Sequence, residues 1–67
     1  MKIHLKAARV NAGLTQDQVA KELGVSKGTI INYELYRTKP DVDTGKALAK
    51  LYGMSVDDII FFEEKVC

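Results

Sequence analysis

The chain has 67 residues, of which 46% are hydrophobic and 28% are charged, and its formal net charge is +1. This composition is typical of one small globular domain rather than of a disordered chain, and no apolar run reaches the roughly 18 residues that a membrane-spanning helix requires. The only cysteine is Cys67, so no intrachain disulfide is possible and we expect a cytoplasmic protein.

Charge is distributed unevenly along the chain. Residues 1–40 contain seven basic and three acidic residues, whereas residues 41–67 contain three basic and six acidic residues. This polarity would allow one part of the domain to face a polyanion while the other part faces solvent or a partner. The small net charge therefore does not exclude nucleic acid as a ligand.

The hydrophobic pattern predicts five helices, and strand alternation does not persist anywhere before the last few residues. The first helix is expected over about Ile3 to Ala12, with Gly13 as a left-handed cap after it. The second helix begins after Thr15, because Gln18 stands three residues later and completes a capping box. Gly24 ends this helix.

The remaining three helices follow at short intervals. The third is expected over about Ser26 to Tyr36, and Pro40 prevents it from continuing. The fourth is expected over about Val42 to Tyr52, with Ala47, Leu48 and Leu51 packed inward. The fifth begins after the cap Ser55. The final letters, FFEEKVC, fit either a frayed turn or a short strand.

The second and third helices, joined by a three-residue turn, form a helix-turn-helix. The small side chain of Ala20 lets the two helices cross closely, and Gly24 permits a positive φ in the turn. The first half of the third helix then has little part in the core and carries Lys27, Gly28 and Asn32. Lys27 suits guanine, Asn32 suits adenine, and Gly28 permits a close approach to DNA.

Several separated motifs agree with one known family. They are GLTQ at 13–16, VAKELGVS at 19–26, TI at 29–30, YE at 33–34 and LAKLYGMSVDDI at 48–59. With these motifs the chain resembles the Cro/C1-type helix-turn-helix domains of phage repressors and xenobiotic-response-element-type regulators, over about Leu5 to Phe61. The resemblance implies a compact, all-α, five-helix fold like that of lambda repressor. We expect residues 1–62 to form this domain and residues 63–67 to form a short tail.

The resemblance also implies a set of functional residues. Base contacts are expected from Ser26, Lys27, Gly28 and Asn32. Phosphate contacts are expected from Gln16, Thr29, Arg37 and Lys39, and the amides at the start of the second helix would assist the first of these. A structural salt bridge is expected between Arg9 and Glu34. Ile31 either touches a thymine methyl group or packs as a half-exposed residue.

Three positions depart from the family pattern. Tyr36 stands where members usually have glycine, and Gly45 stands where they usually have a larger apolar residue. Because a glycine inside a helix costs about 1 kcal/mol relative to alanine, we expect a compensation, with the Tyr36 ring lying in space opened at Gly45. The third departure, Gly28, cannot read a base through a side chain and makes the recognition surface thinner.

Together these features predict a transcriptional regulator, with repression as its effect, that binds double-stranded DNA in a sequence-specific way. It would bind a pseudo-palindromic operator as a homodimer. Apolar residues near the C-terminus are expected to form the dimer interface: Ile60, Phe61, Phe62 and Val66. The alternative is a protein-interaction module, such as an antitoxin or a regulatory partner subunit, that uses the same apolar patch. We expect no enzymatic activity, metal or cofactor, because no convergent set of acid, base and nucleophile is visible.

Overall fold

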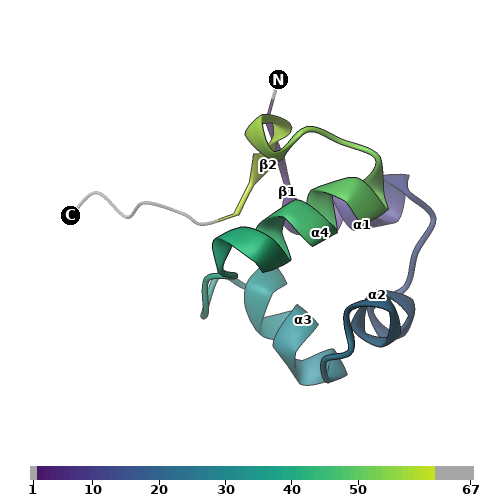
Figure 1. Ribbon diagram of the computed structural model, residues 1–67. Coiled ribbons are helices and arrows are strands. Elements are labelled where there is room, and N and C mark those ends of the chain that lie inside the picture. The colour runs from purple at the N-terminus through teal and green to yellow at the C-terminus, as the bar shows by residue number, and fades with distance from the viewer. Residues whose placement is uncertain (1, 62–67) are drawn as a thin grey trace.

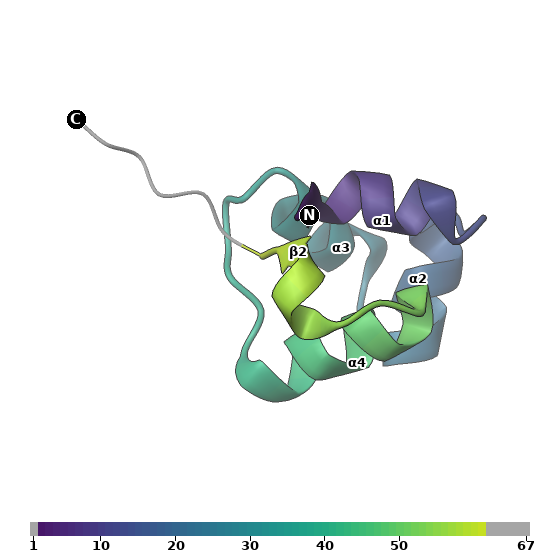
Figure 2. The same ribbon diagram turned by 90° about the horizontal axis from the view of Figure 1, so that it is seen from above.

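The computed structural model describes residues 2–61, and this part of the chain contains four α-helices, one 3-10 helix and a two-stranded sheet. The α-helices are α1 (Leu5–Asn11), α2 (Gln16–Leu23), α3 (Lys27–Glu34) and α4 (Val42–Tyr52). The 3-10 helix η1 covers Val56–Asp58. Strands β1 (Ile3–His4) and β2 (Ile59–Ile60) pair in parallel near the start of α1 (Figures 1 and 2).

Both ends of the described chain differ from the predicted helices. Ile3 and His4 form β1, so the first helix begins two residues later than expected. The predicted fifth helix is the short η1 followed by β2, and a fold of five α-helices is therefore not confirmed. The physical reason is the parallel ladder, in which Ile3 pairs with Ile59 and His4 with Ile60. Isoleucine is β-branched and favours the extended backbone of a strand.

The turn between α2 and α3 has the geometry that the sequence predicts. At the start of α2 the capping box is present, because Thr15 and Gln18 each accept a hydrogen bond from the other's backbone N–H. At its end Gly24 has a φ of 69°, and the N–H of Val25 donates to the carbonyl of Ala20 at 3.0 Å. A Cβ at Gly24 would meet nothing within 4 Å, so the left-handed backbone, not lack of space, requires glycine there.

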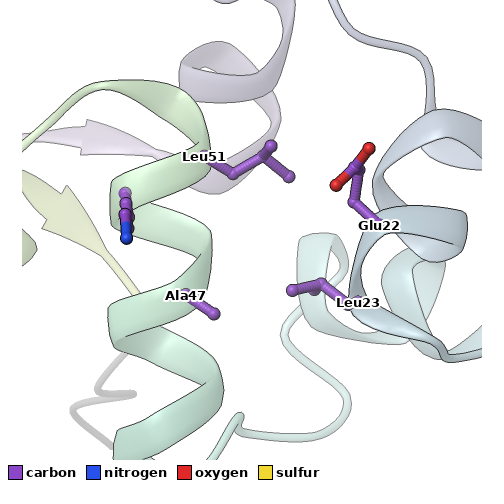
Figure 3. A pocket seen from close by; sticks show the side chains of 5 residues that line it. Glu22, Leu23, Ala47 and Leu51 are labelled. Atoms are coloured by element: carbon purple, nitrogen blue, oxygen red, sulfur yellow. The ribbon is translucent and has the colours of Figure 1, made fainter.

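The core lies where the four helices and β2 meet. Its buried apolar side chains are Leu5, Ala8, Val19, Ala20, Ile30, Leu48, Ala49, Tyr52 and Ile59. On α4 the prediction is confirmed for Leu48, which is buried, and for Leu51, which is half-buried and packs against the core, whereas Ala47 is half-buried and is not part of the core. Gly45, Ala49 and Tyr52 of the same helix are also buried. Ala47 and Leu51 line a groove between α2 and α4 (Figure 3).

Gly45 faces Phe61, and the expected contact between Gly45 and Tyr36 is wrong. A Cβ added to Gly45 would have as its nearest neighbours three atoms of the Phe61 ring, at 3.8 to 4.0 Å. These are ordinary van der Waals distances. The ring of Phe61, in the segment after β2, therefore occupies the space above Gly45. The sequence pattern did not predict this contact.

Tyr36 instead joins α3 to the sheet. Its φ of 60° is the one positive φ at a non-glycine residue among the described positions. Its hydroxyl donates to the carbonyl of Ile60 at 2.9 Å and accepts the N–H of Leu5 at 3.3 Å. His4 Nδ1 lies 2.9 Å from the same hydroxyl. Since the only hydroxyl proton goes to Ile60, the His4 nitrogen must be the donor in this third bond.

Substitution of Gly45 tests the contact with Phe61. Gly45→Ala is expected to raise the free energy of unfolding by up to about 1 kcal/mol, because alanine is the better helix former and its methyl group fits against the ring. Gly45→Leu is expected to lower it, because the longer side chain displaces Phe61. Urea unfolding followed by circular dichroism measures both. Equal stabilisation by the two substitutions would show that Phe61 does not occupy this space.

Substitution of Tyr36 tests the hydroxyl that joins α3 to the sheet. Tyr36→Phe is expected to lower the free energy of unfolding by about 1 to 2 kcal/mol, because the Ile60 carbonyl and the Leu5 N–H lose a partner. Tyr33→Phe is the control, since its hydroxyl takes no part in this cluster, and a change within about 0.5 kcal/mol is expected. Equal effects of the two substitutions in urea unfolding would contradict the role given to Tyr36.

Candidate nucleic-acid interface

The start of α3 presents polar residues to solvent. Ser26, Lys27 and Gly28 are exposed and Asn32 is half-buried, whereas Ile30 is buried in the core. Ile30 thus holds the helix in place from one side, and the first turn on the other side remains accessible. Figure 1 shows α3 with α2 beside it at one edge of the molecule.

The hydroxyls of Ser26 and Thr29 cap this helix. Ser26 Oγ accepts the N–H of Thr29 at 3.2 Å and lies 3.0 Å from Thr29 Oγ1. Only one of the two hydroxyl protons is needed for the bond between the oxygens, so the other can donate to an acceptor outside the protein. The cap therefore fixes the start of α3 and still offers one donor to a base or a phosphate.

An ion pair joins α1 to α3. Arg9 Nε lies 2.6 Å from Glu34 Oε2, and the two side chains are only 11% and 5% exposed. Arg9 Nη1 also donates to the carbonyl of Leu14 at 2.8 Å. This pair, which the family resemblance implies, ties the first helix, the turn before α2 and the end of α3 together.

Gln16, the first residue of α2, binds the same carboxylate. Its Nε2 donates to Glu34 Oε1 at 3.0 Å. An amide nitrogen carries two hydrogens, so one can stay on Glu34 while the other points to a second acceptor. The N-terminal end of a helix favours an anion. Gln16 is thus held in a position from which it could donate to a phosphate.

Tyr52 contributes to the environment of this ion pair, which the sequence did not indicate. It is buried at the end of α4. Burial, together with the negative charge of Glu34, raises the pKa of Tyr52 to about 12, and the charge of Arg9 offsets part of the rise. The phenol of Tyr52 therefore stays neutral at physiological pH and adds no charge near the ion pair.

The predicted basic contacts lie on the surface at both ends of α3. Lys27 is 3.8 Å from Asp17, but both side chains are more than half exposed, and such a surface pair contributes little. Lys27 can therefore exchange Asp17 for a nucleic acid. Arg37 and Lys39 are exposed in the connector that follows α3, at the same helix end at which Gln16 binds Glu34.

The predicted dimer interface is only partly within the described residues. Ile60 and Phe61 are half-buried, and Phe61 packs against the core. Phe62 and Val66 lie outside the described residues. Within residues 2–61, no three His, Cys, Asp or Glu side chains gather in a way that could hold a metal ion. No helix in that range has the length and apolar character needed to cross a membrane.

The groove between α2 and α4 has a volume of about 410 Å³. It is lined by Leu23, Ala47 and Leu51 together with Glu22 and Lys50, and Figure 3 shows Glu22 and Leu23 on α2 across from Ala47 and Leu51 on α4. One acid and one base, both exposed, do not make a convergent catalytic set. This groove is therefore a weaker candidate for a functional site than the polar surface on α2 and α3.

Comparison with known proteins identifies the family of the chain. A family profile described as helix-turn-helix matches residues 5–59. No solved structure is significantly similar to the chain.

Three relatives illustrate the similarity. The chain is 39% identical to the HTH-type transcriptional regulator MJ0272 of Methanocaldococcus jannaschii, over 96% of the chain and 97% of the relative. It is 38% identical to the HTH-type transcriptional regulator ImmR of Bacillus subtilis, over 90% of the chain and 47% of the relative. It is 34% identical to the cryptic phage CTXphi transcriptional repressor RstR of Vibrio cholerae, over 84% of the chain and 50% of the relative. The chain thus spans nearly all of the first relative and about half of the other two.

The pKa of Tyr52 gives stability a dependence on alkaline pH. The phenol ionises near pH 10.0 in the unfolded chain and near pH 12 in the folded one. The raised pKa therefore contributes fully to the free energy of unfolding below about pH 10, and this contribution is lost as the pH rises from about 10 to about 12. Urea unfolding across this range should show the chain losing stability relative to Tyr52→Phe. A constant difference between the two proteins would contradict the raised pKa.

Proposed function

This chain belongs to the Cro/C1-type helix-turn-helix family and is a DNA-binding transcriptional regulator, and we propose that it represses transcription by inserting α3 into the major groove of an operator. The observation that carries this proposal is the exposed first turn of α3, held from behind by Ile30. The name of the RstR relative supports repression as the effect. The alternative of a protein-interaction module is not favoured by these relatives.

Sequence is read, in this proposal, by the first two turns of α3. Asn32 suits a bidentate contact with adenine, and Lys27 suits the acceptors of guanine. Ser26 can donate through its hydroxyl, and Gly28 lets the helix backbone come close to the base edges. The recognition surface is small, so each of these contacts carries a large share of the specificity.

The position of α3 in the groove is set by contacts to the DNA backbone. The proposed phosphate contacts are Gln16, Thr29, Arg37 and Lys39. Glu34 acts through the first of these, because its carboxylate holds the Gln16 amide at 3.0 Å with one N–H free to donate. Such contacts fix the register of a protein on DNA and carry no sequence information themselves.

A homodimer is part of the proposal, because one small module buries too little surface for tight and specific binding. Two copies related by a two-fold axis would place their recognition helices about 34 Å apart, which is one turn of B-DNA. The operator would then be pseudo-palindromic. In this arrangement residues 1–62 form the DNA-binding domain, residues 63–67 form a tail, and the interface is made by Ile60, Phe61, Phe62 and Val66.

The division between base contacts and phosphate contacts is testable on an operator selected from a random duplex pool. Asn32→Ala is expected to weaken operator binding by about 1 to 3 kcal/mol and to relax the preference at one base position. Lys39→Ala is expected to weaken binding to operator and random DNA alike. Fluorescence anisotropy with both duplexes measures the effects. Equal losses on both duplexes for both substitutions would contradict the proposed roles.

The salt dependence of binding tests the proposed function as a whole. If a dimer neutralises about eight phosphates, the logarithm of the binding constant should fall against the logarithm of salt concentration with a slope of about −7. Anisotropy with pooled random duplexes between about 50 and 200 mM salt measures this slope. A slope near zero, or no binding by the folded protein at the lower concentration, would contradict a DNA-binding function.

A further inference from the structure

Asp17 is an acidic residue on the surface proposed to meet DNA. It is the second residue of α2, directly after Gln16, and its side chain is 73% exposed. The capping box at the start of α2 is made by Thr15 and Gln18 and does not use the Asp17 carboxylate. Because a carboxylate repels phosphate, Asp17 lowers the affinity of this surface for the DNA backbone. The proposed function gives this residue no role.

The Asp17 carboxylate faces the first residue of α3. Lys27 Nζ lies 3.8 Å from Asp17 Oδ2, across the turn that joins the two helices. Lys27 is the only basic residue of α3. The contact therefore involves the one cation that this helix can offer to DNA.

The separation in this ion pair leaves the hydrogen-bond donors of Lys27 available. The distance of 3.8 Å exceeds the roughly 3.2 Å of an N–H···O hydrogen bond. The carboxylate therefore offsets part of the charge of the ammonium group without taking up any of its three N–H donors. A lysine in this state binds a charged acceptor less favourably than a free lysine does, whereas its capacity to donate to an uncharged acceptor is kept.

DNA offers Lys27 both kinds of acceptor. A phosphate carries a full negative charge, which the nearby Asp17 carboxylate repels. The O6 and N7 atoms of guanine are acceptors without a net charge, so Asp17 repels them less. Phosphate contacts supply nearly all of the affinity for random DNA. Asp17 therefore penalises random DNA more than it penalises an operator that places a guanine at Lys27, and a penalty on the wrong ligand raises specificity.

We propose that Asp17 is a specificity-determining residue, which acts through Lys27 and directs its ammonium group to a base edge instead of a phosphate. Asp17 is a positioning residue in this role and does not itself contact a base. The inference rests on the proposed function and deepens it, because it says how the one cation of α3 discriminates between operator and random DNA. The favourable effect of an acid at a helix N-terminus concerns the stability of α2, and it leaves the ratio of the two affinities unchanged.

Asp17→Asn tests this role, because it removes the charge and keeps the size of the side chain. The affinity for random duplexes is expected to rise about fivefold, whereas the affinity for the selected operator should change by less than about twofold. Lys27 then neutralises a phosphate on random DNA, so the salt slope there should steepen by about 0.9 for each bound copy. Fluorescence anisotropy with both duplexes measures these changes, and circular dichroism shows that the variant is folded.

Glu22→Gln is the matched control, because it removes the same charge from the same helix. Glu22 lines the groove that faces α4 (Figure 3), and its substitution should leave the ratio of operator to random affinity unchanged. Asp17→Glu keeps the carboxylate and should keep the parental ratio. An equal fall in the ratio for Glu22→Gln and Asp17→Asn would show that net charge alone matters, and it would overturn the proposal.

A substitution at Lys27 tests whether Asp17 acts through this residue. Lys27→Met removes the ammonium group and keeps an unbranched side chain. In this background Asp17→Asn should no longer change the ratio of the two affinities, because substitutions of two residues that act together are not additive. The same gain on random DNA in both backgrounds would mean that Asp17 repels the DNA backbone directly, and the proposal would be wrong.

Failure of this proposal is distinguishable from failure of the proposed function. A parent chain that binds random duplexes with the expected salt dependence, but whose Asp17→Asn variant keeps the parental ratio and slope, overturns only the role of Asp17. A folded parent chain that binds no duplex at any salt concentration overturns the regulator and this role together.

Discussion

The buried carboxylate of Glu34 is the point on which the arrangement of the first three helices depends. It accepts from Arg9 of α1 and from Gln16 of α2, while it belongs itself to the last turn of α3. Removing one partner of a buried ion pair typically costs about 3 to 5 kcal/mol, which is a large share of the stability of a domain this small. The relative positions of the three helices are therefore strongly constrained.

The same helix is joined at its end to the sheet. Tyr36 follows α3 and uses one hydroxyl to bind Leu5 and Ile60, although its left-handed backbone costs about 1 to 2 kcal/mol in a residue with a Cβ. The Tyr36 hydroxyl thus links the end of α3, the helix proposed to enter the DNA groove, to the start of α1 and to β2, beside the proposed dimer contact. A two-fold dimer can fix the distance between recognition helices only if such a connection does not bend.

The local signals in the sequence predicted the helix-turn-helix and failed where the contacts are long-range. Thr15, Gln18 and Gly24 act within their own turns, so their roles could be read from the chain. Two-residue strands carry no alternation, and the sheet was therefore missed. The contact of Gly45 with Phe61 depends on how the segment after η1 returns to α4. The Arg9–Glu34 pair came from the family resemblance and not from spacing, and the bond from Gln16 to Glu34 appears only in three dimensions.

We propose that the starts of α2 and α3, with the connector after α3, form the DNA-binding surface. Two-dimensional amide NMR during titration with duplex DNA tests this surface residue by residue in one experiment. The largest shift changes are expected at Gln16, at Lys27 to Thr29 and at Arg37 to Lys39, with small changes along α4. Changes concentrated on α4, with none at the start of α3, would contradict this proposal.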